Sequence, residues 1–214
     1  MAKRKKAWLM SEDEYLKAEE KSSVRHEFVD GHVFAMVGAS KAHNKIAINI
    51  LVLMRQRLGG GPCDIFMSDM KLRIQSLKSY YYPDLIVSCE PFEAKSACVQ
   101  QPIILVEVLS SGTKEIDHRE KLIAYKKIPS LQEYVIVHQD RQKIELFRRS
   151  GDAWDAISFT PPGEELILES MPGGPLTVPF SLVYEGYNPP SRVKETEAEY
   201  EVESDFHPYV PVFT

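Results

Sequence analysis

The sequence has few cysteines for its length, three among 214 residues. Cys63, Cys89 and Cys98 are odd in number, and their spacing matches neither a metal-ligand motif nor a disulfide scaffold. The sequence therefore indicates no structural zinc. We expect free thiols in a reducing compartment.

The chain also lacks an apolar run long enough to span a bilayer. The segment Met1 to Lys6 lacks the apolar core of a secretory signal peptide. We therefore expect a cytoplasmic protein that makes no use of a membrane. The length and the ordinary composition suit a single domain, expected over residues 1–187, followed by a tail over residues 188–214.

A surplus of positive charge is missing as well, since 26 Lys and Arg residues stand against 31 Asp and Glu, for a net charge of -5. This balance argues against avid nucleic-acid binding, because neutralising phosphates requires a basic surface. In the tail, six acidic residues outnumber two basic ones, so the tail carries -4 of the total and the body is close to neutral. The acidic part has the composition of a disordered segment, and the apolar residues after it, Phe206 to Phe213, suggest a dimer clasp as a hypothesis.

Two apolar stretches each carry one carboxylate. Pro83-Asp84 precedes Leu85 to Val87, and Glu107 follows Ile103 to Val106. Both stretches are typical of strands that are covered on both faces. An ionised acid there is costly unless a cation pairs with it, and a hard divalent cation, the usual catalyst of phosphate-ester hydrolysis, would do so. The alternative for Pro83-Asp84 is an ordinary turn that starts a strand.

A lysine on the following helix is expected beside Glu107. Small polar residues follow the Glu107 strand, and a helix is predicted from about residue 114 to 127. About eight helical residues of roughly 1.5 Å each bring Lys121 back along the strand to about the level of Glu107. Asp117, Lys121 and Tyr125 share one helix face. The alternative is an exposed ion pair between Asp117 and Lys121, and Tyr125 is interpreted as a packing residue.

In this order, Pro83-Asp84, Glu107-Val108-Leu109 and Asp117-x-x-x-Lys121-x-x-x-Tyr125 resemble the PD-(D/E)XK nuclease superfamily. The resemblance is to a branch of bacterial restriction endonuclease-like proteins in which the lysine has moved to the following helix. It extends over most of the chain, from His26 to the strand after Tyr134. The superfamily's usual lysine position is Leu109 here, so Lys121 must replace that lysine from the helix.

The resemblance implies roles for individual residues. Asp84 and Glu107 would bind Mg²⁺ or Mn²⁺, with the backbone carbonyl of Val108 as a third ligand. Lys121 would orient the attacking water or offset charge on the phosphate.

Glu27 and His43 match the family's recurring acid and histidine. Without the resemblance, Glu27 is equally well a solvent-facing strand residue before the Asp30-Gly31 hairpin turn. His43, near the start of a predicted helix, is otherwise a surface or packing residue.

The predicted elements indicate an α/β fold with a mixed central β-sheet flanked by helices, a restriction-endonuclease-like core, and extra antiparallel strands near the C-terminus. Helices are expected over 11–20, 42–58 and 114–127, and strands over 64–74, 82–88, 103–107, 133–138, 143–148, 153–159 and 165–169. The order strand, helix, strand after Glu107 predicts a right-handed parallel crossover.

The expected activity is metal-dependent hydrolysis of DNA by an endonuclease. A homodimer would supply the two sites needed to cut both strands of a duplex. Two alternatives stay open. One is a non-catalytic relative that binds nucleic acid or protein, which Leu109 and the negative charge favour; the other is a metal-dependent phosphohydrolase acting on small nucleotides.

Overall fold

The computed structural model describes residues 9–36, 38–109, 115–163 and 165–189, with the side chains of residues 115–118 left aside. The helices are α1 (Glu12–Lys21), α2 (Lys41–Leu58), α3 (Glu115–Tyr125) and α4 (Phe180–Val183), with a 3-10 turn at Gln75–Leu77. The strands are β1 (His26–Val29), β2 (His32–Ala35), β3 (Asp64–Met67), β4 (Lys71–Ile74), β5 (Ser79–Tyr81), β6 (Leu85–Ser88), β7 (Cys98–Val99), β8 (Pro102–Leu109), β9 (Glu133–His138), β10 (Ile144–Ser150), β11 (Ala153–Phe159), β12 (Leu166–Leu168) and β13 (Leu176–Val178).

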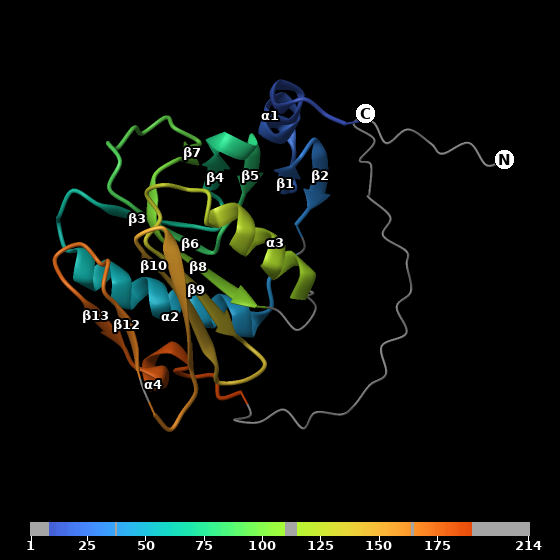
Figure 1. The fold of residues 1–214 in the computed structure, drawn as a ribbon. Coiled ribbons are helices and arrows are strands. Elements are labelled where there is room, and N and C mark those ends of the chain that lie inside the picture. Colours follow the sequence, from blue (N-terminus) through green and yellow to red (C-terminus); the bar gives the residue numbers. More distant parts are fainter. Residues whose placement is uncertain (1–8, 37, 110–114, 164, 190–214) are drawn as a thin grey trace.

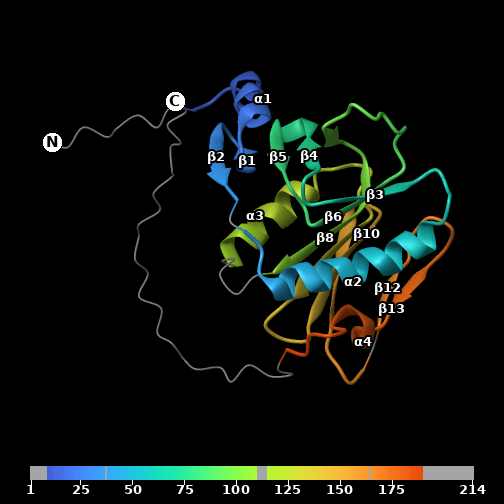
Figure 2. The ribbon, with the colours of Figure 1, turned by 180° about the vertical axis from the view of Figure 1, so that it is seen from behind.

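A six-stranded sheet in the order β11-β10-β9-β8-β6-β3 forms the centre of the molecule. Strands β8 and β9 are parallel and are joined through α3, as predicted, while the other neighbours in this sheet pair antiparallel. Figures 1 and 2 show α3 on one face of this sheet and α2 on the other. The predicted mixed α/β architecture is confirmed.

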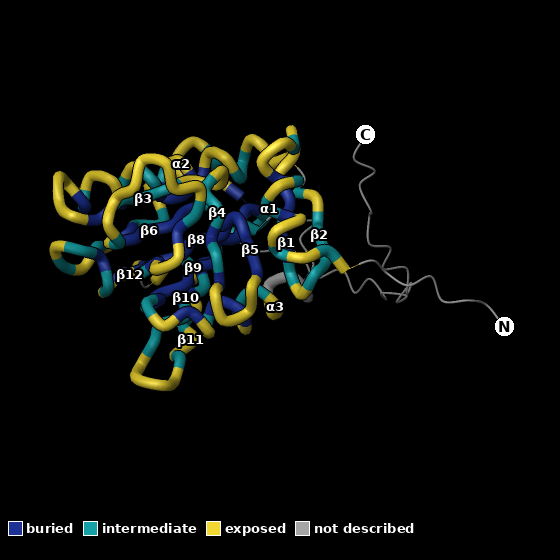
Figure 3. Tube along the Cα trace, turned by 90° about the horizontal axis from the view of Figure 1, so that it is seen from above, coloured by how far each residue is buried: buried dark blue, intermediate teal, exposed yellow. Residues whose placement is uncertain are grey.

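The two faces of the sheet carry separate cores, because successive strand residues point to opposite sides. In β8, Ile104 and Val106 pack with Ile46, Ile50 and Met54 of α2. Leu105, one residue away from each, belongs instead to the cluster that contains Ala124 and Tyr125 of α3. The central strands are accordingly among the most buried parts of the chain (Figure 3). By the same alternation, the side chain of Glu107 lies on the α3 face.

A second sheet, in the order β2-β1-β5-β4-β7, lies beside the first. Strands β1 and β2 of this sheet form a hairpin whose turn lies at Asp30 and Gly31. Both turn residues have positive φ, as the Asp-Gly pair predicts. Helix α1 starts with a capping box between Ser11 and Glu14, and the Tyr15 hydroxyl donates to the His26 carbonyl at 2.7 Å. The tyrosine contact holds β1, the strand that carries Glu27, against α1.

The expected strand over 64–74 is wrong. The segment instead forms β3 and β4, which belong to different sheets, with a turn at Ser68-Asp69 between them. Of the strand expected over 82–88, only the last four residues form a strand, which is β6.

The expectation of free thiols is also wrong, because Cys63 and Cys89 form a disulfide. Strands β3 and β6 are antiparallel, and Asp64 pairs with Ser88. The two cysteines therefore follow as the next opposed pair, beyond the end of both strands. The pairing removes the basis on which a reducing compartment was expected. Cys98 is free.

The C-terminal strands complete the core on the α2 side. Strand β11, expected over 153–159, lies at the edge of the six-stranded sheet, while β12 pairs with β13 in a separate two-stranded sheet. Leu168, Val178 and Val183 pack into the α2 cluster. Of the tail expected from residue 188, only Asn188 and Pro189 lie within the described residues. No helix in the described ranges is both long and apolar enough to cross a membrane.

Candidate active site

Asp84 and Glu107 are brought together by the pairing of β6 with β8. Leu85 pairs with Val106 in antiparallel register, so one further step along both strands sets Asp84 opposite Glu107. Directly opposed residues in an antiparallel pair project to the same side of the sheet, about 5 Å apart at Cβ. The two predicted carboxylates therefore share the α3 face at one edge of the sheet.

Glu107 is buried, with 10% of its side chain exposed. Its Oε1 accepts a hydrogen bond from the Tyr125 hydroxyl at 2.8 Å and lies 3.3 Å from Lys121 Nζ. Burial raises the pKa of Glu107 to about 7, against the opposing effect of Lys121. A cation close to this carboxylate therefore offsets a real desolvation cost.

Lys121 reaches the site from α3, at the level predicted from helix geometry. Its Nζ lies 2.8 Å from Glu27 Oε1, so it bridges Glu27 on β1 and Glu107 on β8. Burial alone lowers the pKa of Lys121, but the charges of Glu107 and Glu27 outweigh burial and raise it. Lys121 is therefore a charged, buried lysine, and the alternative of an exposed helix ion pair is wrong for it.

Glu27 is likewise not solvent-facing, since 17% of its side chain is exposed and it is paired with Lys121. The side chain of Asp117, the other member of the predicted helix face, lies outside the described residues.

His43 contacts Asp84 from the first turn of α2. Ser40 caps this helix by accepting from the His43 amide at 3.0 Å, and the Ser40 hydroxyl donates to Gln139 at 2.7 Å, which ties the helix start to the end of β9. His43 Nε2 lies 2.8 Å from Asp84 Oδ1. Burial lowers the pKa of His43, but the hydrogen bond and charge of Asp84 outweigh it and raise the pKa. His43 is therefore neither a surface residue nor a plain packing residue.

The backbone of Val108 borders the same carboxylates. Its N–H donates to Asp84 Oδ2 at 2.7 Å, so the peptide edge of Val108 faces the Asp84 side. In antiparallel strands a residue directs its N–H and C=O to the same side. The position opposite Val108 in the register is Pro83, which has no N–H to donate to that carbonyl. Strand β6 therefore gives the Val108 carbonyl no donor, but a backbone hydrogen bond between His43 and Val108 helps to raise the pKa of His43. A metal bound at this carbonyl would share it with His43.

The donor set fits a magnesium-like ion better than zinc. Within the described part of the chain, no group of three or more His, Cys, Asp and Glu side chains is arranged to hold a metal. Two carboxylates and a carbonyl are hard oxygen donors, and Mg²⁺ is commonly held by one or two carboxylates while it keeps several waters. The structure brings together every residue predicted for this site.

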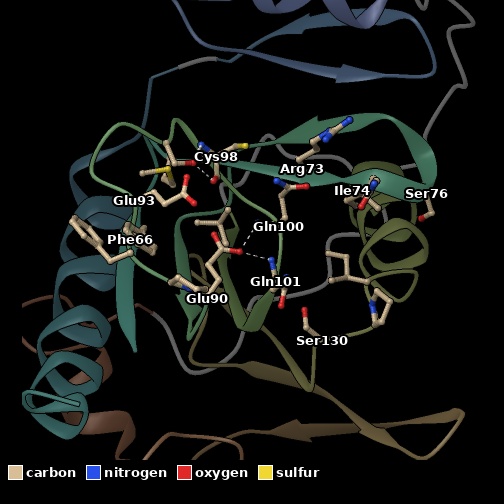
Figure 4. A pocket seen from close by; sticks show the side chains of 18 of the residues that line it. Phe66, Arg73, Ile74, Ser76, Glu90, Glu93, Cys98, Gln100, Gln101 and Ser130 are labelled. Carbon is tan, nitrogen blue, oxygen red and sulfur yellow. Dashed lines mark hydrogen bonds between the residues drawn. The ribbon is translucent and has the colours of Figure 1, made fainter. Parts of the chain in front are cut away.

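One large cavity is separate from these residues. It encloses about 870 Å³ between the two sheets, and its lining includes Gln101, next to the start of β8, rather than Glu107 near the end (Figure 4). The Glu90 carboxylate accepts hydrogen bonds from the backbone amides of Gln100 and Gln101 at 3.1 and 3.0 Å. Its charge is therefore stabilised by donors in the cavity wall. None of the predicted site residues lines this cavity, and chemistry rather than cavity size defines the site.

The hydrogen bond from Tyr125 to Glu107 was not predicted from the sequence. The signal was present, since Tyr125 follows Lys121 by one helical turn on the same face. A tyrosine in an apolar helix face is nevertheless ordinary packing unless the position of its hydroxyl is known.

Comparisons with known proteins identify a family and a fold. A model of the family Uma2, described as "Putative restriction endonuclease", matches residues 12–179. Two uncharacterized proteins of Synechocystis sp. (strain ATCC 27184 / PCC 6803 / Kazusa) are similar. The protein slr1290 is 36% identical over 152 residues, which covers 70% of this chain and 80% of that protein. The protein sll1609 is 33% identical over 147 residues, covering 67% and 83%.

A solved structure has the same fold. It is the crystal structure of "a putative nuclease belonging to DUF820" from Anabaena variabilis ATCC 29413, with a TM-score of 0.69 at 15% sequence identity, covering 81% of this chain and 97% of that chain. The resemblance to the PD-(D/E)XK superfamily is confirmed, and a nuclease-like class of function follows from the family. The chain belongs to the Uma2 family of restriction endonuclease-like proteins.

Proposed function

We propose that this protein is a metal-dependent endonuclease that hydrolyses DNA phosphodiester bonds. The observation that carries the proposal is the position of Lys121, whose ammonium group lies 3.3 Å from Glu107 although it comes from a helix rather than from the usual strand position. Leu109 in that strand position and the negative net charge both favour a non-catalytic relative. The helix-borne lysine weakens the first of these two reasons.

In the proposed mechanism, Asp84, Glu107 and the Val108 carbonyl would hold Mg²⁺ or Mn²⁺. Such an ion, when bound, activates water and stabilises charge on the phosphate. His43 holds the Asp84 carboxylate through Oδ1, and the Val108 amide holds it through Oδ2, so both oxygens have a fixed direction. Second contacts of this kind commonly set the orientation of metal ligands.

Lys121 supplies the fixed positive charge of the site. It is buried and paired with two carboxylates, so it stays protonated at neutral pH and does not act as a base. Its role in the proposal is to orient the attacking water or offset charge that develops on the phosphate. The Lys121 ammonium group also pairs with the Glu27 carboxylate on β1. This second ion pair keeps Lys121 on the β1 side of Glu107.

The expected partner is DNA, and the expected assembly is a homodimer, because cleavage of both strands requires two sites. The folded body is close to neutral, so we expect weak electrostatic affinity for DNA and a contribution from the bound metal.

Plasmid cleavage tests the proposal directly. Wild-type protein and the variant Glu107→Gln are incubated with supercoiled plasmid and with single-stranded DNA, each with EDTA, Mg²⁺ or Mn²⁺. We expect metal-dependent cutting by the wild type and at least a hundredfold loss in the variant, because a neutral amide is a poor ligand for a hard cation. The exposed Lys127→Ala variant, on the same side of the sheet, should cut normally.

The remaining outcomes separate the alternatives. A thermal shift with Mn²⁺ but no cutting of any DNA would transfer the proposal to small phosphoester substrates. Absence of both the shift and the cutting would favour a non-catalytic relative.

A further inference from the structure

Tyr125 lies fully buried one helical turn after Lys121. Its hydroxyl donates to Glu107 Oε1 at 2.8 Å, which is the same oxygen that Lys121 approaches at 3.3 Å. The tyrosine contact is the shorter of the two and is made by a neutral donor, while the lysine is also drawn toward Glu27. The hydroxyl therefore gives Glu107 a directional contact that does not depend on the position of the Lys121 charge.

The phenol ring is itself held by two other rings. It makes edge-to-face contacts with Tyr81, at a centroid distance of 5.4 Å, and with Tyr134, at 5.1 Å. Tyr81 belongs to β5 and Tyr134 to β9, so rings from both sheets fix the ring from α3. Edge-to-face packing inside a close-packed core leaves the ring little freedom to turn.

We propose that Tyr125 is a positioning residue for Glu107, which fixes the carboxylate in the orientation that binds the metal. This inference rests on the proposed function, because it assigns Glu107 a metal to bind. Tyr125 acts through Glu107 and touches neither substrate nor metal. A residue with this role sets metal affinity without changing the ligand set.

The chain offers a matched control in Tyr134. It is also fully buried and belongs to the same ring cluster. Its hydroxyl, however, has no hydrogen-bond partner among the described residues. The variants Tyr125→Phe and Tyr134→Phe therefore remove the same atom from neighbouring positions, and only the first breaks a contact with Glu107. Both keep the aromatic ring and its packing.

The test is a Mn²⁺ titration of the full chain, read both as a thermal shift without DNA and as plasmid cleavage. Tyr125→Phe should need roughly 10- to 100-fold more Mn²⁺ for half of its maximal response, the range found when groups behind a metal ligand are removed. Tyr134→Phe should titrate like the wild type. In a Glu107→Gln background, Tyr125→Phe should cause no further change.

Two results would overturn the inference. If the wild type responds to Mn²⁺ and Tyr125→Phe has the same midpoint, or both Phe variants shift equally, Tyr125 is only a packing residue and the proposed function is unaffected. If the wild type itself shows no Mn²⁺ response in either readout, the proposed function and this inference fail together.

Discussion

Lys121 is the residue on which the candidate site most depends, because two buried carboxylates share its charge. Lys121→Met would leave Glu27 and Glu107 facing each other without a cation. Removing one partner of a buried ion pair costs about 3 kcal/mol or more of unfolding free energy. We therefore expect both a loss of that size in urea unfolding and at least a hundredfold loss of cleavage.

The double variant Glu27→Gln with Lys121→Met separates these two effects. Removing one carboxylate relieves the repulsion, so stability should recover in part while cleavage stays lost. Recovery of cleavage in the double variant would contradict the role given to Lys121.

Glu145 provides a pH-dependent prediction away from the site. The imidazole of His138, whose Nε2 lies 3.5 Å from Glu145 Oε1, and contacts with Lys143 lower the pKa of Glu145 to about 2. Because the folded pKa is depressed, this carboxylate stabilises the fold above its ordinary pKa of 4.5, and the stabilisation is lost as the pH falls toward 2.

The variant Glu145→Gln should therefore be less stable than the wild type by about 1 kcal/mol at pH 7, a modest value because the pair is partly exposed. Urea unfolding at pH 7, 5 and 3 measures this difference, which should shrink across the series. A difference that is constant with pH would mean that the variant acts through packing instead.

Most residues of the candidate site could be predicted from the sequence, because their positions follow from strand ends and helix length. Asp84 and Glu107 stand at strand ends, and helix rise alone set Lys121 level with Glu107. The contact of His43 with Asp84 could not be predicted, since it depends on how α2 crosses the sheet. The role of Tyr125 was hidden for the same reason, because a hydroxyl position is a property of three-dimensional packing.

Among the secondary-structure elements, the link between β3 and β6 gives the clearest prediction. The disulfide joins Cys63 to Cys89 across 26 residues of sequence. Cross-linking a loop of this length stabilises a protein by roughly 3 kcal/mol, mainly by restricting the unfolded chain. We expect dithiothreitol to lower the unfolding free energy by about that amount.

The variant Cys98→Ser, which keeps the disulfide, should show the same loss on reduction, and Cys63→Ser should show none. Equal stability of the wild type with and without reductant would contradict the pairing. Reading this pair from sequence would have required the register of β3 against β6. A single strand over residues 64–74 does not give that register, although Ser68 and Asp69 are ordinary turn residues.

For the molecule as a whole, the charge is divided between a nearly neutral body and an acidic tail. A truncation after Pro189 removes a net charge of -4 from the total of -5. The described core ends before this point, so the melting temperature should change little. DNA affinity at low salt should increase, because repulsion of phosphates by the tail is lost.

Fluorescence anisotropy with a labelled duplex at two salt concentrations measures this change, and the gain should vanish at high salt. A large fall in melting temperature would show instead that the tail belongs to the folded domain. The predicted boundary at residue 187 would then be wrong, and a clasp made by the tail would become the better interpretation.

The central claim is that Asp84 and Glu107 hold a catalytic divalent cation, and anomalous scattering from crystals grown with Mn²⁺ tests it most directly. The account predicts an anomalous peak between the two carboxylates, about 2.2 Å from an oxygen of each and within reach of the Val108 carbonyl. A peak at any other place, or none while Lys121 still fills the space beside Glu107, would contradict it.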